Sequence, residues 1–80
     1  MNGNIITEED VYELLYALRP ECNFKESKDF VGDYLLDSLD TFSLVCDIDE
    51  KYGIEIDVSI IEPSDFKDVE SIIKLISKYN

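Results

Sequence analysis

The chain has 80 residues, of which 45% are hydrophobic, so it is long enough for one small folded domain over residues 1–80 and too apolar for a disordered tail. Nineteen acidic residues against seven basic ones give a net charge of −12. This balance excludes a nucleic acid as partner, because neutralising phosphates requires clustered lysine and arginine, and it favours protein partners with basic surfaces.

The first predicted element is a helix from about Glu8 to Leu18. Thr7 and the three acidic residues that follow it have the pattern of a helix N-terminus, where a threonine side chain caps backbone N–H groups. Apolar residues then recur at helical spacing, namely Val11, Leu14, Leu15 and Leu18. Arg19-Pro20 ends the helix, because proline disfavours helical geometry at the residue before it.

The next segment, from Pro20 to Leu36, is expected to be a long connection that is pinned to the core. Its apolar residues show no sustained helical or strand periodicity, yet they are too many for a free loop: Phe24, Phe30, Val31, Tyr34 and Leu35. A link of this length without regular structure is unusual in a compact domain and is often functional. It leads to Ser38 at the start of the next predicted helix.

That second long helix is predicted from Leu39 to Tyr52 and presents two apolar rows. One row suits the core and consists of Leu44, Val45, Ile48 and Tyr52. The other row, Leu39, Phe42 and Cys46, repeats at i, i+3 and i+7 and is either a docking surface or simply more core. Gly53 is typical of the residue that ends a helix.

The remainder of the chain is expected to hold a short helical turn and a final helix. Residues 54–58 alternate in polarity, but a helical domain offers a strand nothing to pair with, so we interpret them as an extended linker. A helical turn is expected over Val58 to Glu62, and Asp68 has the position of an N-cap. Apolar residues with helical spacing follow, namely Val69, Ile72, Ile73 and Ile76. The sequence therefore predicts an all-α fold of three main helices plus one short helix.

Ser38 has the most distinctive surroundings in the chain, the sequence Leu36-Asp37-Ser38-Leu39-Asp40. The chain has no histidine to activate a serine, which disfavours catalysis by this hydroxyl. A hydroxyl on the first turn of a helix is exposed, and a helix N-terminus favours a negatively charged phosphate. We therefore expect covalent modification of Ser38 and do not expect the chain to be an enzyme.

The Asp-Ser-Leu motif and the order of elements resemble the acyl carrier protein family over nearly the whole chain, best from Leu36 to Ile56. The resemblance implies a small four-helix bundle with a long loop between its first two helices. It also implies a 4′-phosphopantetheine arm on Ser38 that carries fatty acyl, polyketide or aminoacyl cargo as a thioester between enzymes, as in fatty acid biosynthesis. The stretch from Ile61 to Ile73 looks closer to stand-alone carriers that work with an adenylating enzyme, including D-alanyl carrier proteins.

The resemblance implies partners and roles for the residues around Ser38. A phosphopantetheinyl transferase installs the arm, with Asp37 helping to position its magnesium and substrate, although Asp37 also suits a helix N-cap. Leu39 belongs to the same attachment site. The implied contacts with loading ligases or transferases and with downstream enzymes are Leu39, Phe42 and Cys46, with an acidic rim of Asp40, Asp49 and Glu50. No metal is expected to be held by the carrier itself.

Two other interpretations start from the acidic composition. Asp47 and Asp49 invite comparison with a calcium-binding loop, which requires a glycine at its sixth position. Counted from Asp47, Gly53 is at the seventh position, so the spacing does not fit. The second alternative is an acidic helical interaction module without a prosthetic group, which would not need Ser38.

Cysteine content and hydropathy bear on the cell compartment. Apolar stretches are only a few residues long and the N-terminus lacks a basic-then-apolar signal pattern, so neither a membrane span nor secretion is expected. Without secretion, a disulfide between Cys22 and Cys46 is not expected, and Cys46 is expected to pack rather than react. We expect a monomer in the cytoplasm.

Overall fold

A computed structural model describes residues 5–79, and these residues form an all-helical fold. The three α helices are α1 (Glu8–Leu18), α2 (Ser38–Tyr52) and α3 (Val69–Tyr79). The first link, residues 19–37, contains the 3₁₀ turn η1 (Phe24–Glu26), and the second link, residues 53–68, contains the 3₁₀ turn η2 (Pro63–Phe66). The Cα radius of gyration of 11.6 Å is that of a compact globule of this length.

The helices begin and end where local chemistry dictates. The Thr7 hydroxyl accepts a hydrogen bond from the Asp10 N–H at 3.2 Å, and the Asp10 carboxylate accepts one from the Thr7 N–H at 3.0 Å, which starts α1 as predicted. Gly53 ends α2 in the left-handed conformation, with φ 65° and ψ 37°. The Asp68 carboxylate accepts a hydrogen bond from the Ser71 N–H at 2.7 Å, which confirms it as the cap of α3.

The predicted short helix differs in place and kind. Over residues 58–62 the chain makes only a turn, in which the Ile60 N–H donates to the Asp57 carbonyl at 3.3 Å. The helical turn comes later, as η2, because Pro63 has the fixed φ of a first helical residue and no N–H to lose there. Residues 5–79 contain no strand, so the interpretation of residues 54–58 as a linker is confirmed.

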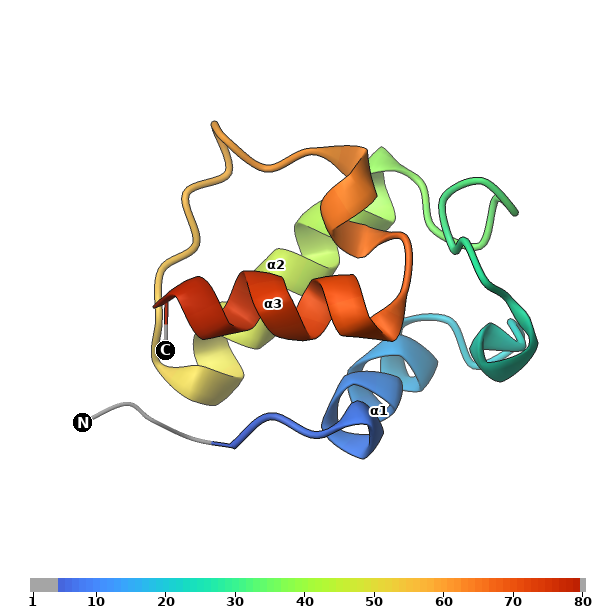
Figure 1. The fold of residues 1–80 in the computed structure, drawn as a ribbon, viewed down its shortest axis with the longest axis horizontal. Coiled ribbons are helices and arrows are strands. Elements are labelled where there is room, and N and C mark those ends of the chain that lie inside the picture. The colour runs from blue at the N-terminus through green and yellow to red at the C-terminus, as the bar shows by residue number, and fades with distance from the viewer. Residues whose placement is uncertain (1–4, 80) are drawn as a thin grey trace.

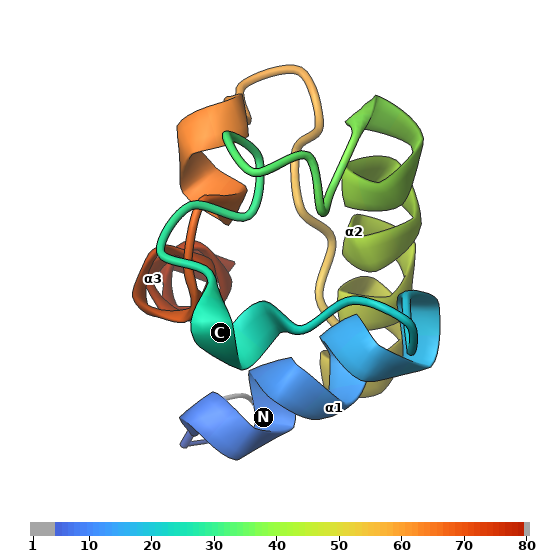
Figure 2. The same cartoon turned by 90° about the vertical axis from the view of Figure 1, so that its right-hand side faces the viewer.

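Helix α1 packs against both α2 and α3; α3 passes in front of α2 in Figure 1, and Figure 2 shows these two helices apart, with α1 below them. The most deeply buried side chains come from all three helices, from η1 and η2 and from the first link: Val11, Leu15, Phe24, Phe30, Leu44, Val45, Ile48, Phe66, Ile72 and Ile76. The predicted core row of α2 is therefore confirmed at three of its four positions, and the fourth, Tyr52, is half-buried.

The first link is pinned to the core, as its apolar content predicts. The Phe24 ring meets the Tyr16 ring edge-on at 5.5 Å between centroids and the Phe30 ring at 5.2 Å. The Phe30 N–H donates to the Lys67 carbonyl at 2.6 Å, which ties the link to the segment that leads into α3 (Figure 2). Within residues 5–79, no helix combines the length and the apolar character that crossing a membrane requires.

Candidate functional site

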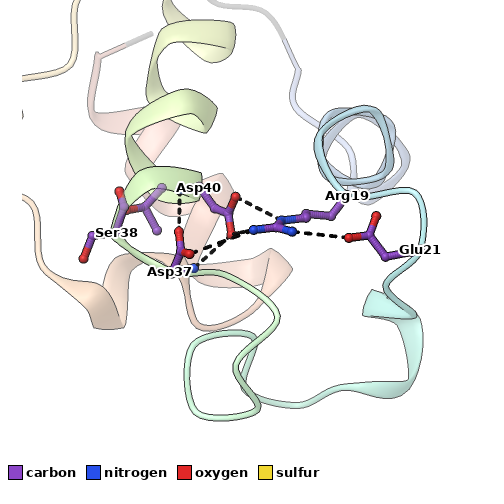
Figure 3. A network of polar contacts seen from close by, with 6 residues as sticks. Arg19, Glu21, Asp37, Ser38 and Asp40 are labelled. Atoms are coloured by element: carbon purple, nitrogen blue, oxygen red, sulfur yellow. Dashed lines mark hydrogen bonds and ion pairs between the residues drawn. The ribbon is translucent and has the colours of Figure 1, made fainter.

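The start of α2 is held by a reciprocal pair of hydrogen bonds around Ser38. The Asp37 carboxylate accepts from the Asp40 N–H at 2.9 Å, and the Asp40 carboxylate accepts from the Asp37 N–H at 3.1 Å. Asp37 is therefore the N-cap, as one of its two predicted roles requires, and Ser38 is the first helical residue. Ser38 is exposed, and its hydroxyl points away from this pair of acids (Figure 3).

A surface cavity of about 360 Å³ opens beside Ser38. The first link, the start of α2 and the region of η2 line it, with Val31, Tyr34, Leu36, Asp37, Ser38, Thr41, Ile61, Glu62, Pro63 and Phe66 as the contributing residues. Six of these ten residues are apolar or aromatic. The cavity can therefore receive a partly apolar chain attached to the Ser38 oxygen, which is the kind of group that the sequence leads us to expect.

Arg19, the residue after α1, reaches the start of α2 with two parallel hydrogen bonds. Its Nε donates to Asp40 Oδ1 at 3.0 Å and its Nη2 donates to Asp40 Oδ2 at 2.9 Å (Figure 3). The same Nη2 lies 3.9 Å from Asp37 Oδ2, and Nη1 donates to Glu21 at 3.3 Å. The two-pronged geometry is the strong form of arginine–carboxylate pairing.

Asp40 is the one buried charged residue among those described, with 7% of its surface exposed. Burial alone raises the pKa of a carboxyl, because it penalises the charged form. The hydrogen bonds from Arg19 and from the Asp37 N–H outweigh burial, and the pKa of Asp40 lies below its ordinary value of 3.8. Asp40 is therefore an ionised carboxylate that is already paired within the chain.

The second apolar row of α2 lies on the surface. Leu39 is 77% exposed and Phe42 is 56% exposed, and Cys46 is also exposed. Of the two interpretations of this row, exposure favours the docking surface over additional core. It also corrects the expectation that Cys46 packs.

The predicted acidic rim divides into three different environments. Glu50 is exposed, as a partner-contacting acid must be. Asp49 is half-buried, and its carboxylate accepts a hydrogen bond from the Ile56 N–H at 3.0 Å, which holds the start of the second link. Asp40 departs from the expectation, because its carboxylate faces Arg19 inside the fold and does not form part of an exposed rim.

Two features of the site were not predicted. Tyr34 was expected to help pin the first link, but it is 93% exposed, has the left-handed φ of 63° and lines the cavity beside Ser38. The pairing of Arg19 with Asp40 joins residues 21 positions apart. A local sequence pattern cannot predict a pair of residues this far apart. The only signals in the sequence are an arginine directly after a helix and an acid three residues after an N-cap.

Comparisons of the chain with protein-family models, with curated proteins and with solved structures found no match. Across residues 5–79, the acidic and cysteine side chains form no group of three or more that is arranged to hold a metal ion.

Proposed function

We propose that the chain is an acyl carrier protein in which Ser38 bears a 4′-phosphopantetheine arm. The observation that carries the proposal is the exposed Ser38 hydroxyl on the first residue of α2, beside a mainly apolar surface cavity. An all-helical fold and a long first link that ends at this serine support it. In this proposal the cytoplasm is the place of action and the chain works as a monomer.

The modification would use coenzyme A and a phosphopantetheinyl transferase. The Ser38 oxygen forms a bond to the phosphorus that carries the pantetheine, the pyrophosphate bond of coenzyme A breaks, and the nucleotide leaves as its bisphosphate. The hydroxyl proton passes to a base of the transferase, because this chain contains no histidine. Asp37, exposed and adjacent to Ser38, is the residue of this chain that would help to place the transferase's magnesium.

The residues around the cavity are those that would contact the arm. When bound, the arm supplies a thiol that holds an acyl or aminoacyl group as a thioester. Val31 and Tyr34 from the first link and Ile61 and Pro63 from the second would lie along it. Their apolar surfaces would shield part of the arm from water, and Thr41 and Glu62 would offer it polar contacts.

The exposed side of α2 would receive the partner enzymes. Leu39 and Phe42 provide apolar surface on the turns that follow Ser38, and Glu50 provides an exposed carboxylate further along the same helix. A loading enzyme with a basic patch would be steered by such charges, each worth about 0.2–1 kcal/mol, while the apolar side chains supply contact area.

The test is the intact mass of the protein after incubation with coenzyme A, magnesium and a broad-specificity phosphopantetheinyl transferase. The wild-type protein is expected to gain one phosphopantetheine, and Ser38→Ala is expected to gain none. Ser38→Ala should fold normally, because Asp37 and not Ser38 makes the capping bonds. Ser43→Ala, which removes another exposed hydroxyl from α2, is the matched control and should gain one arm. An unmodified wild-type protein would favour the acidic interaction module instead.

The docking surface has its own test. Phe42→Ala should slow loading by the transferase several-fold while changing the melting temperature little, because Phe42 is more than half exposed. Val58→Ala, which truncates an exposed apolar side chain on the second link, is the matched control and should load at the wild-type rate. A large loss of stability with unchanged loading would assign Phe42 to the core.

A further inference from the structure

Arg19 connects the two ends of the first link. It stands immediately after α1, and its guanidinium spans both carboxylate oxygens of Asp40 in the first turn of α2. The ion pair therefore closes the link at its base, where residues 19 and 37 come together (Figure 3).

Asp40 is bound from two directions. Its Oδ2 accepts from Arg19 Nη2 at 2.9 Å and from the Asp37 N–H at 3.1 Å, so a single oxygen joins α1 to the capping box of α2. The backbone of Ser38 lies between the two members of that box. The residues on either side of Ser38 are thus bonded to each other and, through Asp40, to Arg19 at the end of α1.

We propose that Arg19 is a positioning residue for modification of Ser38. It does not contact the Ser38 hydroxyl. It acts through Asp40, by fixing the orientation of the first turn of α2 against α1, so that the hydroxyl is presented to the transferase in one direction. This inference rests on the proposed carrier function, and it assigns a role to a residue 19 positions before the attachment site.

The central test is the kinetics of loading by the transferase with coenzyme A and magnesium. Arg19→Gln keeps a polar side chain but loses the charge and the two-pronged donor, and it should lower kcat by about tenfold or more, because misplacing a reacting atom is costly. The KM for the protein should stay within about twofold of wild type, because the exposed surface of Leu39 and Phe42 is unchanged. The kcat of Arg19→Lys should lie between those of the wild type and Arg19→Gln, because lysine restores the positive charge but not the two parallel hydrogen bonds.

Two controls separate positioning from general destabilisation. Glu21→Gln removes the charge of the one acid that Arg19 contacts outside the start of α2, and it should leave kcat unchanged. Ile76→Val weakens the core in α3, where Ile76 is fully buried, and should leave kcat unchanged at temperatures at which the protein is folded. Loss of kcat in Ile76→Val equal to that in Arg19→Gln would show that stability alone governs loading and would overturn the inference.

Hydrogen exchange supplies a readout that does not involve the transferase. In Arg19→Gln the amides of Asp40 and Thr41, which bond to Asp37, should exchange faster, while the Ile72 amide, which bonds to the Asp68 carbonyl, should not. Unchanged exchange at Asp40 and Thr41, or wild-type kcat in Arg19→Gln, would overturn the inference and leave the carrier function standing. A wild-type protein that gains no arm would instead overturn the carrier function, and this inference with it.

Discussion

The two links between the helices are built on opposite plans. The first link buries Phe24, Phe30 and Leu36 along its length and is closed at its base by the ion pair of Arg19. The second link buries Ile56 near its start and Phe66 near its end, and between them Val58 is 48% exposed and Ile60 is 66% exposed. The first link leads directly into Ser38, whereas the second is buried only near its two ends and contributes Ile61, Pro63 and Phe66 to the cavity beside Ser38.

The two links therefore contribute differently to the stability of the fold. Apolar burial is the main favourable contribution to folding, so a link that buries large side chains at several points contributes to the core and cannot move at those points without unfolding part of it. A link that is anchored only at its ends can change in the middle at little cost in free energy. Substitutions in the two links should therefore differ widely in effect.

The largest effect is expected at Phe30. Phe30→Ala removes a side chain that is 1% exposed and packs edge-on against Phe24, so it should lower the free energy of unfolding by about 3–5 kcal/mol. Urea denaturation followed by circular dichroism measures this change. A loss as small as that of an exposed residue would contradict the description of the first link as part of the core.

The next effect is expected at Asp40 and depends on pH. Asp40→Asn keeps the shape but weakens the bonds to Arg19, and should lower the free energy of unfolding by about 1–3 kcal/mol at neutral pH. The folded pKa of Asp40 is below 3.8, so the charged form contributes its stabilisation above that pH and loses it as the pH falls through the folded pKa.

Denaturation curves at a series of pH values test the sign of this dependence. The stabilities of the wild type and Asp40→Asn should converge as the pH falls from 3.8 through the folded pKa of Asp40, because the wild-type carboxylate becomes protonated over that range. Asp10, Asp57 and Asp68, whose pKa values are also lowered by hydrogen bonds, are present in both proteins and cancel in the difference. A difference that grows with acidity would contradict the ion pair.

A smaller effect is expected where the second link begins. Gly53→Ala should cost about 1–2 kcal/mol, because a left-handed φ of 65° is unfavourable for a residue with a Cβ and nothing lies within 4 Å of that position to clash or to compensate. Gly53→Asn should cost less, since asparagine tolerates this conformation better. Equal effects of alanine and asparagine would show that the backbone conformation does not decide the cost.

The smallest effect is expected in the middle of the second link. Ile60→Ser should change the free energy of unfolding by less than about 0.5 kcal/mol, because the side chain is two-thirds exposed. The melting temperature measured by circular dichroism is sufficient to test this. A loss comparable to that of Phe30→Ala would remove the distinction between the two links.

The elements with strong local signals are the ones that the sequence predicts correctly. The bounds of α1, the cap of α2 at Asp37, the glycine that ends it and the cap of α3 at Asp68 all follow from residues within a few positions of one another. The sequence predicts the short helix over residues 58–62, whereas the structure has it at Pro63–Phe66, because proline favours the first position of a helical turn.

The parts of the site that sequence reasoning missed depend on contacts distant along the chain. Asp40 has the same local pattern as an exposed helical acid, and only its pairing with Arg19 places it inside. Tyr34 resembles a core residue by its apolar ring, but in the structure it has a left-handed backbone conformation and is exposed. The exposure of Leu39 and Phe42 was one of two open interpretations, which packing around α2 had to decide.

The pairing of Arg19 with Asp40 has a consequence for long-range electrostatics. A count of acids from the sequence overstates the negative potential near Ser38, because the Asp40 charge is neutralised by a cation of the same chain. An approaching basic protein instead meets surface carboxylates such as Asp47 and Glu50, each screened beyond about 8 Å at about 0.15 M salt. The decline of its association rate with ionic strength should therefore reflect fewer charges than a count of the acidic residues alone suggests.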